Sequence, residues 1–316
     1  MQDVLDSPAL HIPARPLPIR AATPAVRRSE WVIAAFLIYA AGMALFLPVA
    51  PPVRSPVLLL NVAVLGMYAL LVSLDSGRPM LALGIARDWL PLAVILLAYR
   101  EMGWFALPHR GHALEAHWVI WDRLILHGGA KTAIEAFGPL LPAILEIAYA
   151  LVYALAPFSI AMLYLYGYRD QVDRFLIVFV TGVLLCYAQF TFWPSDPPRI
   201  VFSGQDFPSY DTVFRQFNWW MLGNYGIHTS VFPSAHVAGA FSAAFGMWRA
   251  MPRPKWVNRF LFAVAVLIAV ATVYGRYHYF ADAAAGLAMA TLSLVLQRNP
   301  APAKGNHRLR VKALRS

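Results

Sequence analysis

Apolar residues fill eight long stretches of this chain, and short segments that carry most of the charged and polar residues separate them. A transmembrane helix needs about 20 apolar residues, and about 17 can be enough. Each stretch therefore predicts one membrane-spanning helix. The predicted spans are residues 31–50, 56–74, 88–106, 138–165, 174–193, 234–250, 258–275 and 278–297. The fold class that follows is an all-α, polytopic membrane bundle with about eight transmembrane helices.

Two segments between the spans have patterns of their own. Residues 109–129 place large apolar side chains at helical spacing opposite a charged face, which is typical of a helix lying in the membrane interface. These side chains are Leu114, Trp118, Trp121 and Ile125. Residues 200–231 form a polar and aromatic loop with two adjacent tryptophans near its middle. We expect this loop either to cap a site or to lie at the lipid headgroups.

The composition supports a membrane protein and excludes other classes. The 316 residues are 59% hydrophobic and only 13% charged, with a mean hydropathy of +0.56. Soluble domains carry roughly a quarter charged residues. The net charge of +10 does not indicate a nucleic-acid partner, because the excess lies in the tails and short loops. The one cysteine, Cys186, lies within an apolar stretch, which excludes an intrachain disulfide and a cysteine metal site.

The positive charges predict how the chain crosses the membrane. Eight spans put both tails on one side, and that side then holds 18 Lys and Arg residues, against 8 on the other. Cytoplasmic segments carry the excess of Lys and Arg. Both tails are therefore predicted to be cytoplasmic. The short loops and lean tails favour a bacterial inner membrane.

Ionisable residues gather at the predicted outer ends of the last spans. His278 and Asp282 are four residues apart, so on a helix they share one face, one turn from each other. A carboxylate in that position holds one imidazole nitrogen and leaves the other available for attack. Upstream lie His236, in Phe232-Pro-Ser-Ala-His236, and Arg199, in Pro194-Ser-Asp-Pro-Pro-Arg199. Because charged groups in membrane segments are costly and usually functional, these residues indicate a site.

The residue types in this site suit phosphoryl transfer. That reaction needs a nucleophile, a proton donor for the departing alkoxide, and cations that hold the phosphate oxygens. We predict that His278 is the nucleophile, that Asp282 orients its ring, and that His236 is the general acid. The predicted phosphate ligands are Arg199, Arg276 and Ser234, the last of which begins a span and offers its hydroxyl and free backbone N–H groups. We expect neither a metal nor another cofactor.

These motifs resemble the type-2 phosphatidic acid phosphatase superfamily over roughly residues 110–297. Pro233-Ser-Ala-His236 is similar to that family's Pro-Ser-Gly-His, and the His278–Asp282 pair is similar to its His-x-x-x-Asp. The resemblance implies the same roles for the two histidines and the aspartate. It is closer to the inositol phosphorylceramide synthase branch, whose Pro-x-x-Pro-Pro element is similar to residues 194–198. Residues 271–282 also match that branch's Ala-Thr-x-Tyr-x-x-x-His-Tyr-Phe-x-Asp segment.

Departures from the phosphatase branch favour transfer over hydrolysis. Phe192 stands where that branch has a lysine, Ile200 replaces the proline after the arginine, and Thr272 stands where an arginine precedes the nucleophile. The resemblance implies a phospholipid substrate and a lipid alcohol acceptor, ceramide or diacylglycerol. Hydrolysis with water as the acceptor is the alternative. A more remote alternative is that the protein is a non-catalytic transporter or scaffold.

The predicted organisation has four parts. They are a disordered cytoplasmic tail (1–30), N-terminal transmembrane helices (31–106), a catalytic membrane domain (107–297) and a basic cytoplasmic tail (298–316). Within the catalytic part, Glu146 is either a headgroup or acceptor contact or a hydrogen-bond partner between helices. Four loop histidines have poor zinc-ligand spacing and predict a hydrated interfacial face instead. They are His109, His112, His117 and His127. The headgroup, the acceptor and the oligomeric state stay open.

Overall fold

A computed structural model describes residues 26–47, 51–78, 80–105, 111–227 and 229–297. All regular secondary structure in the described ranges is helical. The described residues form no strand, and the one β-contact is an isolated bridge between Ser195 and Ser230. The all-α prediction is therefore confirmed. The predicted tails lie almost wholly outside the described residues, but the first helix begins at Arg28, before the predicted tail ends.

Each predicted span corresponds to one helix. The eight helices are α1 (Arg28–Phe46), α2 (Pro51–Gly77), α3 (Leu81–Met102), α6 (Leu140–Leu165), α7 (Val172–Phe190), α10 (Ala235–Ala250), α11 (Lys255–Tyr274) and α12 (Phe280–Leu296). Within the described ranges, six of them are long and apolar enough to cross a membrane. The two shorter ones, α10 and α12, have 16 and 17 residues. The protein is thus an integral membrane protein by the length and apolarity of its helices.

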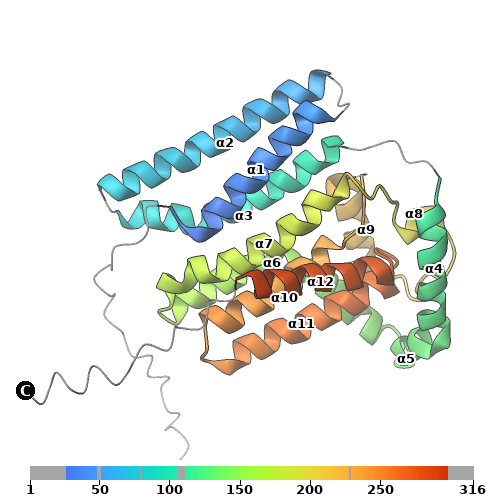
Figure 1. Cartoon of the computed structure of the whole chain (residues 1–316). Helices are drawn as coiled ribbons and strands as arrows, with labels where there is room; N and C mark the ends of the chain where they lie inside the picture. The colour runs from blue at the N-terminus through green and yellow to red at the C-terminus, as the bar shows by residue number, and fades with distance from the viewer. Residues whose placement is uncertain (1–25, 48–50, 79, 106–110, 228, 298–316) are drawn as a thin grey trace, which may run out of the picture.

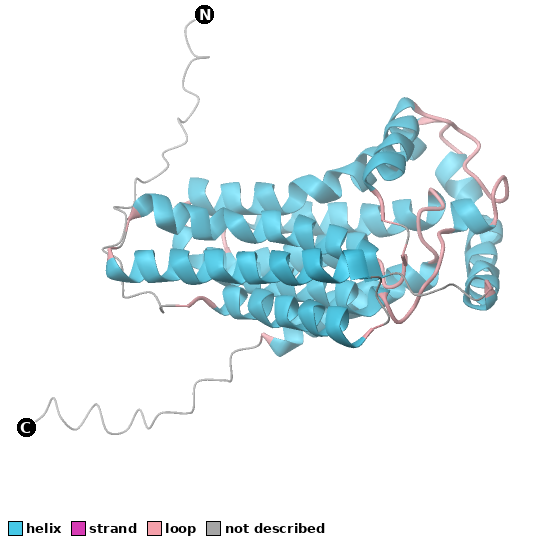
Figure 2. Ribbon diagram, turned by 90° about the horizontal axis from the view of Figure 1, so that it is seen from above, coloured by secondary structure: helices cyan, strands magenta, loops and turns pink. Residues whose placement is uncertain are grey.

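Helix α10 lies at the centre of the bundle. It packs against α6, α7, α11 and α12, while α1 and α3 pack on the other side of α7 (Figure 1). The ends of the described chain lie together, because Arg28 on α1 donates a hydrogen bond to Gln297 just after α12, at 3.1 Å. The opposite end of the bundle carries the short helices (Figures 1 and 2). These are α4 (Ala113–Ile125), α5 (Lys131–Glu135), α8 (Pro198–Val201) and α9 (Val213–Tyr225).

A buried ionic cluster joins the N-terminal helices to the rest of the bundle. Arg87 on α3 pairs with Glu30 on α1 and with Asp75 on α2, each at 2.7 Å. The next residue, Asp88, accepts a hydrogen bond from Arg169, which lies between α6 and α7, at 3.0 Å. Buried charges are stable only when they are paired. The cluster therefore fixes α1, α2 and α3 against one another and against the neighbouring helices.

Helix α4 lies within the predicted interfacial segment 109–129, but one of its predicted apolar residues turns into the protein. Trp118 faces inward and stacks on Phe232, with ring centroids 5.1 Å apart. Two acidic residues on α4, Glu115 and Asp122, are also buried. Trp121 and several neighbouring apolar side chains are exposed. The acidic residues of the predicted charged face thus turn toward partners inside the protein, whereas His112 and His117 are exposed.

The segment 200–231 is more ordered than the predicted loop, since it contains the 13-residue helix α9. Helix α9 packs on α6. Its buried side chains are Arg215 and Asn218, whereas Trp219 and Trp220 are exposed. This helix turns two polar residues toward the protein and its two tryptophans outward, as suits a surface that meets lipid headgroups.

Helices α10 and α12 come close to each other at Gly286. A Cβ added there would lie 2.4 Å from the carbonyl oxygen of Ser234, and neither backbone can rotate away. We expect Gly286→Ala to lower the free energy of unfolding by about 1–3 kcal/mol through overpacking. Thermal unfolding in detergent measures this effect. Gly66→Ala, on α2 with nothing within 4 Å of the added Cβ, is the matched control and should not destabilise the protein.

Candidate active site

A cavity of about 230 Å³ lies among α3, α6, α7 and α10, at the end of the bundle opposite the described termini. Most of its wall is apolar or aromatic. Arg199, His236 and His278 line it together. Arg199 and His278 are 79 positions apart along the chain, yet they meet His236 in one cavity, whose low polarity strengthens electrostatic interactions.

His278 lies in the connection from α11 to α12, against Asp282 in the first turn of α12. The Nδ1 atom of His278 is 3.3 Å from Oδ2 of Asp282. The same Oδ2 accepts a hydrogen bond from the backbone N–H of Tyr279 at 2.9 Å, as a cap on the first turn of α12. The carboxylate is therefore held in place and fixes the ring of His278 through one nitrogen.

His236 lies in the first turn of α10, beside His278. The two ring centroids are 5.5 Å apart. The ring of Tyr149, on α6, stacks on His236 with a centroid distance of 4.8 Å. The Nε2 atom of His236 is buried and has no hydrogen-bond partner among the described residues. An aromatic stack thus fixes this imidazole while leaving a nitrogen available for proton transfer.

Arg199 reaches the cavity from α8, a short helix that begins at Pro198. Its backbone N–H donates to the carbonyl of Arg276 at 3.2 Å, which ties α8 to the connection after α11. The guanidinium donates to the carbonyl of Tyr277 at 3.3 Å and lies 5.9 Å from the centre of that ring. It is the one guanidinium among the described residues that lines the cavity.

Two of the predicted phosphate ligands do not line the cavity. The hydroxyl of Ser234 is fully buried and accepts a hydrogen bond from the N–H of Val237 at 3.3 Å, as the N-cap of α10. Arg276 is fully buried as well, and it pairs with Asp122 on α4 at 2.6 Å. Its backbone lies in the left-handed region, with a φ of 64°. The structure gives both residues internal partners.

Glu146 on α6 is the centre of a buried hydrogen-bond network behind the cavity. Its carboxylate accepts from Arg215 at 3.0 Å, from Asn218 at 2.7 Å and from the hydroxyl of Tyr277 at 2.6 Å. The sequence predicts that Glu146 is either a headgroup or acceptor contact or a hydrogen-bond partner between helices. The structure shows the hydrogen-bond partner. The sequence contained no signal for Arg215 and Asn218 beyond their three-residue spacing on one helix face.

Asp122 and Glu115 support the same region from α4. Asp122 accepts from the N–H of Phe280 at 2.8 Å as well as from Arg276. Burial raises the pKa of Asp122 to about 6, and the bonds from Phe280 and Arg276 oppose that rise. Glu115 accepts from the N–H of Asp196 at 3.1 Å. Glu115 and Asp122 are seven residues apart, so they lie on one face of a helix. This spacing is the sequence feature from which their shared role could have been predicted.

The loop histidines remain apart from the cavity. His127 bonds to Asp206 at 2.9 Å, and Arg123 pairs with the same carboxylate at 3.0 Å. His117 faces the carbonyl of Ala113 on its own helix. His109 lies outside the described residues. Across the described ranges, no group of three His, Cys, Asp or Glu side chains is arranged to hold a metal ion.

A cavity that brings two histidines and an arginine together at one end of a helical membrane bundle has the groups that phosphoryl transfer needs. The chain belongs to the PAP2 superfamily, which matches residues 126–296, more than half of its length. It is also similar to a PA-phosphatase related-family protein of Dictyostelium discoideum, 26% identical over 132 residues. That alignment covers 40% of this chain and 23% of the relative. No solved structure matches the chain. The matched segment contains Arg199, His236 and His278, the three residues that meet in the cavity.

The network around Glu146 should matter more for stability than a surface acid does. We expect Glu146→Ala to lower the free energy of unfolding by about 3–5 kcal/mol, because Arg215 would remain buried without its partner. The control is Asp170→Ala, because Asp170 is an exposed acidic residue. This substitution should change the free energy of unfolding by less than about 0.5 kcal/mol. Thermal unfolding of the purified variants compares the two. Equal stability of both variants would contradict this view of the network.

Proposed function

We propose that this protein is a lipid phosphotransferase of the inositol phosphorylceramide synthase type. It cleaves a phosphoester of a membrane phospholipid and passes the phosphoryl-bearing group to a lipid alcohol, such as ceramide or diacylglycerol. The observation that carries the proposal is the common cavity of His236, His278 and Arg199, in which the two imidazoles are 5.5 Å apart. An attacking and a protonating group at that separation can act on opposite sides of one phosphorus atom.

In the first step, His278 attacks phosphorus through the imidazole nitrogen that Asp282 does not hold. A phosphorus–nitrogen bond forms, and the bond from phosphorus to the alkoxide oxygen of the substrate breaks. Protonated His236 gives its proton to that oxygen, so a neutral lipid alcohol leaves. Arg199 stabilises the charge on the equatorial oxygens. Asp282 stabilises the positive charge that develops on His278.

In the second step, neutral His236 takes the proton of the acceptor hydroxyl. The acceptor oxygen attacks phosphorus, the phosphorus–nitrogen bond breaks, and His278 is regenerated. In this scheme Ser234 and Arg276 act indirectly. Ser234 caps the turn that carries His236, and Arg276 holds the connection that carries His278 against α4. A metal ion has no required part in either step.

Transfer needs a site from which water is largely excluded, and the apolar wall of the cavity favours that condition. Hydrolysis shares the first step and differs only in its acceptor. It is the second candidate, and the name of the Dictyostelium relative favours it. We place the cavity on the outer side of a bacterial inner membrane, with the tails in the cytoplasm. This orientation rests on the excess of Lys and Arg on the side of the tails.

The acceptor is identified by following free phosphate and new lipid products together. Purified protein in detergent is given a panel of phospholipids, with and without ceramide or diacylglycerol. New phospholipid without phosphate release is the expected result, and phosphate release alone would make the protein a lipid phosphatase. His278→Ala should abolish both activities and the covalent phosphoenzyme. Full activity of that variant would rule out the mechanism and favour a non-catalytic role for this site.

The role of His236 can be separated from that of His278 by the leaving group. On a lipid phosphate, His236→Gln should reduce kcat by about 10²–10⁴, because the departing alkoxide is not protonated. On p-nitrophenyl phosphate, whose phenolate leaves without a proton, the loss in the first step should be much smaller. The burst of nitrophenol measures that step alone. Equal losses with both substrates would show that His236 does not donate the proton.

A further inference from the structure

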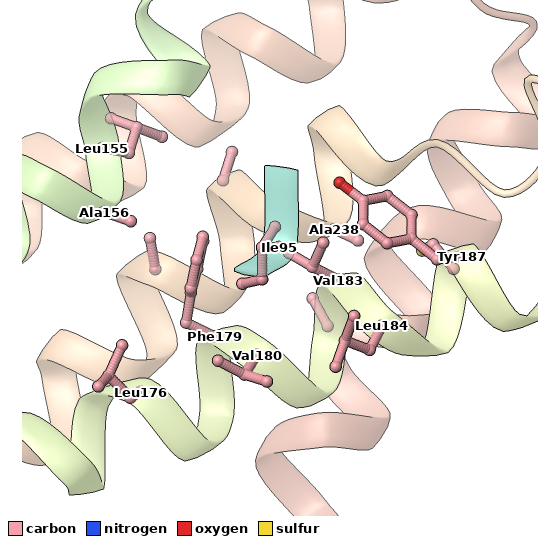
Figure 3. Packing of buried hydrophobic residues seen from close by; sticks show 14 of the residues in the cluster. Ile95, Leu155, Ala156, Leu176, Phe179, Val180, Val183, Leu184, Tyr187 and Ala238 are labelled. Atoms are coloured by element: carbon pink, nitrogen blue, oxygen red, sulfur yellow. The ribbon is translucent and has the colours of Figure 1, made fainter. Parts of the chain in front are cut away.

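Helix α3 lines the catalytic cavity although it lies outside the segment that matches the PAP2 superfamily. The match begins at residue 126, whereas α3 spans Leu81–Met102. Four of its residues, Leu92, Ile95, Leu96 and Tyr99, face the cavity that holds the histidines. Ile95 lies beside the α7 residues Phe179 and Val183, which line the same cavity (Figure 3). Helix α3 therefore supplies one wall of the cavity.

Both ends of α3 are fastened to the family segment. At the inner end, Asp88 accepts hydrogen bonds from Arg169 and Tyr164. At the outer end, the hydroxyl of Tyr99 accepts from the N–H of Ile227 at 3.1 Å. Ile227 itself lines the cavity, close to the segment that leads to α10. A helix held at two distant points keeps its side chains at a fixed distance from the opposite wall.

The cavity is open where α3 faces α6. Leu96 on α3 and Tyr153 on α6 both line it, yet they are 57% and 49% exposed. Both helices are long enough to cross the membrane, so the surface beside this opening faces lipid. The residues deeper in the wall, Ile95 and Val183, are buried and apolar. This side of the cavity thus offers hydrocarbon contacts and few polar ones.

We propose that α3 selects the hydrocarbon chain of the lipid that reacts at His278. The chain lies between α3 and α6 against Leu92, Ile95 and Leu96, while the phosphate lies beside Arg199. This inference rests on the proposed lipid phosphate chemistry of the site. A difference of one methylene in an apolar pocket changes specificity by roughly 10–200-fold, so the side chains of α3 are large enough to set a preference for chain length.

Substitutions that narrow or widen the opening test the proposal. Leu96→Trp should lower kcat/KM for a long-chain lipid phosphate about tenfold relative to a short-chain one, chiefly through KM. Ile95→Ala widens the cavity and should therefore raise kcat/KM for the long-chain lipid phosphate relative to the short-chain one. Leu81→Trp is the matched control, since Leu81 is on the same helix, 64% exposed and outside the cavity wall. An unchanged ratio in both folded cavity variants would overturn the proposal.

A binding experiment separates this inference from the catalytic proposal. The single native cysteine, Cys186, is buried, so a thiol reagent should label Leu96→Cys selectively. A long-chain lipid phosphonate should protect that cysteine, and a short-chain phosphonate should not. Protection by ceramide or diacylglycerol alone would assign the chain to the acceptor instead of the donor. Protection without turnover of any lipid phosphate would refute only the proposed reaction, whereas labelling that no lipid slows would refute the role of α3.

Discussion

The arrangement of the site depends on the close contact between the starts of α10 and α12. The N–H of Ser234 donates to the carbonyl of Asp282 at 3.0 Å, and Gly286 leaves room for the backbones to approach. Backbone groups buried in a membrane bundle must find partners inside the protein. This bond satisfies two such groups, and it also brings the helix turn of His236 to the side of His278. The separation of the two imidazoles follows from it.

Polar side chains around this contact come from helices at the end of the bundle, and they point inward. Asp122 on α4 holds both Arg276 and the N–H of Phe280, while Glu146 on α6 holds Arg215 and Tyr277. Each of these charges is buried and paired. Because an unpaired charge would be costly there, the pairs hold their side chains in fixed positions. The exposed aromatic surfaces of α4 and α9 then suit contact with lipid headgroups.

The structure combines the segment that matches the family with further helices that precede it. The histidines and Arg199 all lie within residues 126–296, where the chain matches the PAP2 superfamily. The helices α1, α2 and α3 precede that segment and are joined to one another by the buried pairs of Arg87. The chemistry therefore belongs to the shared part, whereas one wall of the cavity is supplied from outside it.

The sequence by itself determined the membrane class, the helices and the pairing of His278 with Asp282, because apolar length and a four-residue spacing are local properties. Only the tertiary structure decided where Ser234, Arg276 and Trp118 point. Their partners lie on other helices or on neighbouring backbone, and a periodic pattern shows a polar face without showing what meets it. Burial decided the outcome, since a buried charge or donor turns toward whatever partner the packing brings near.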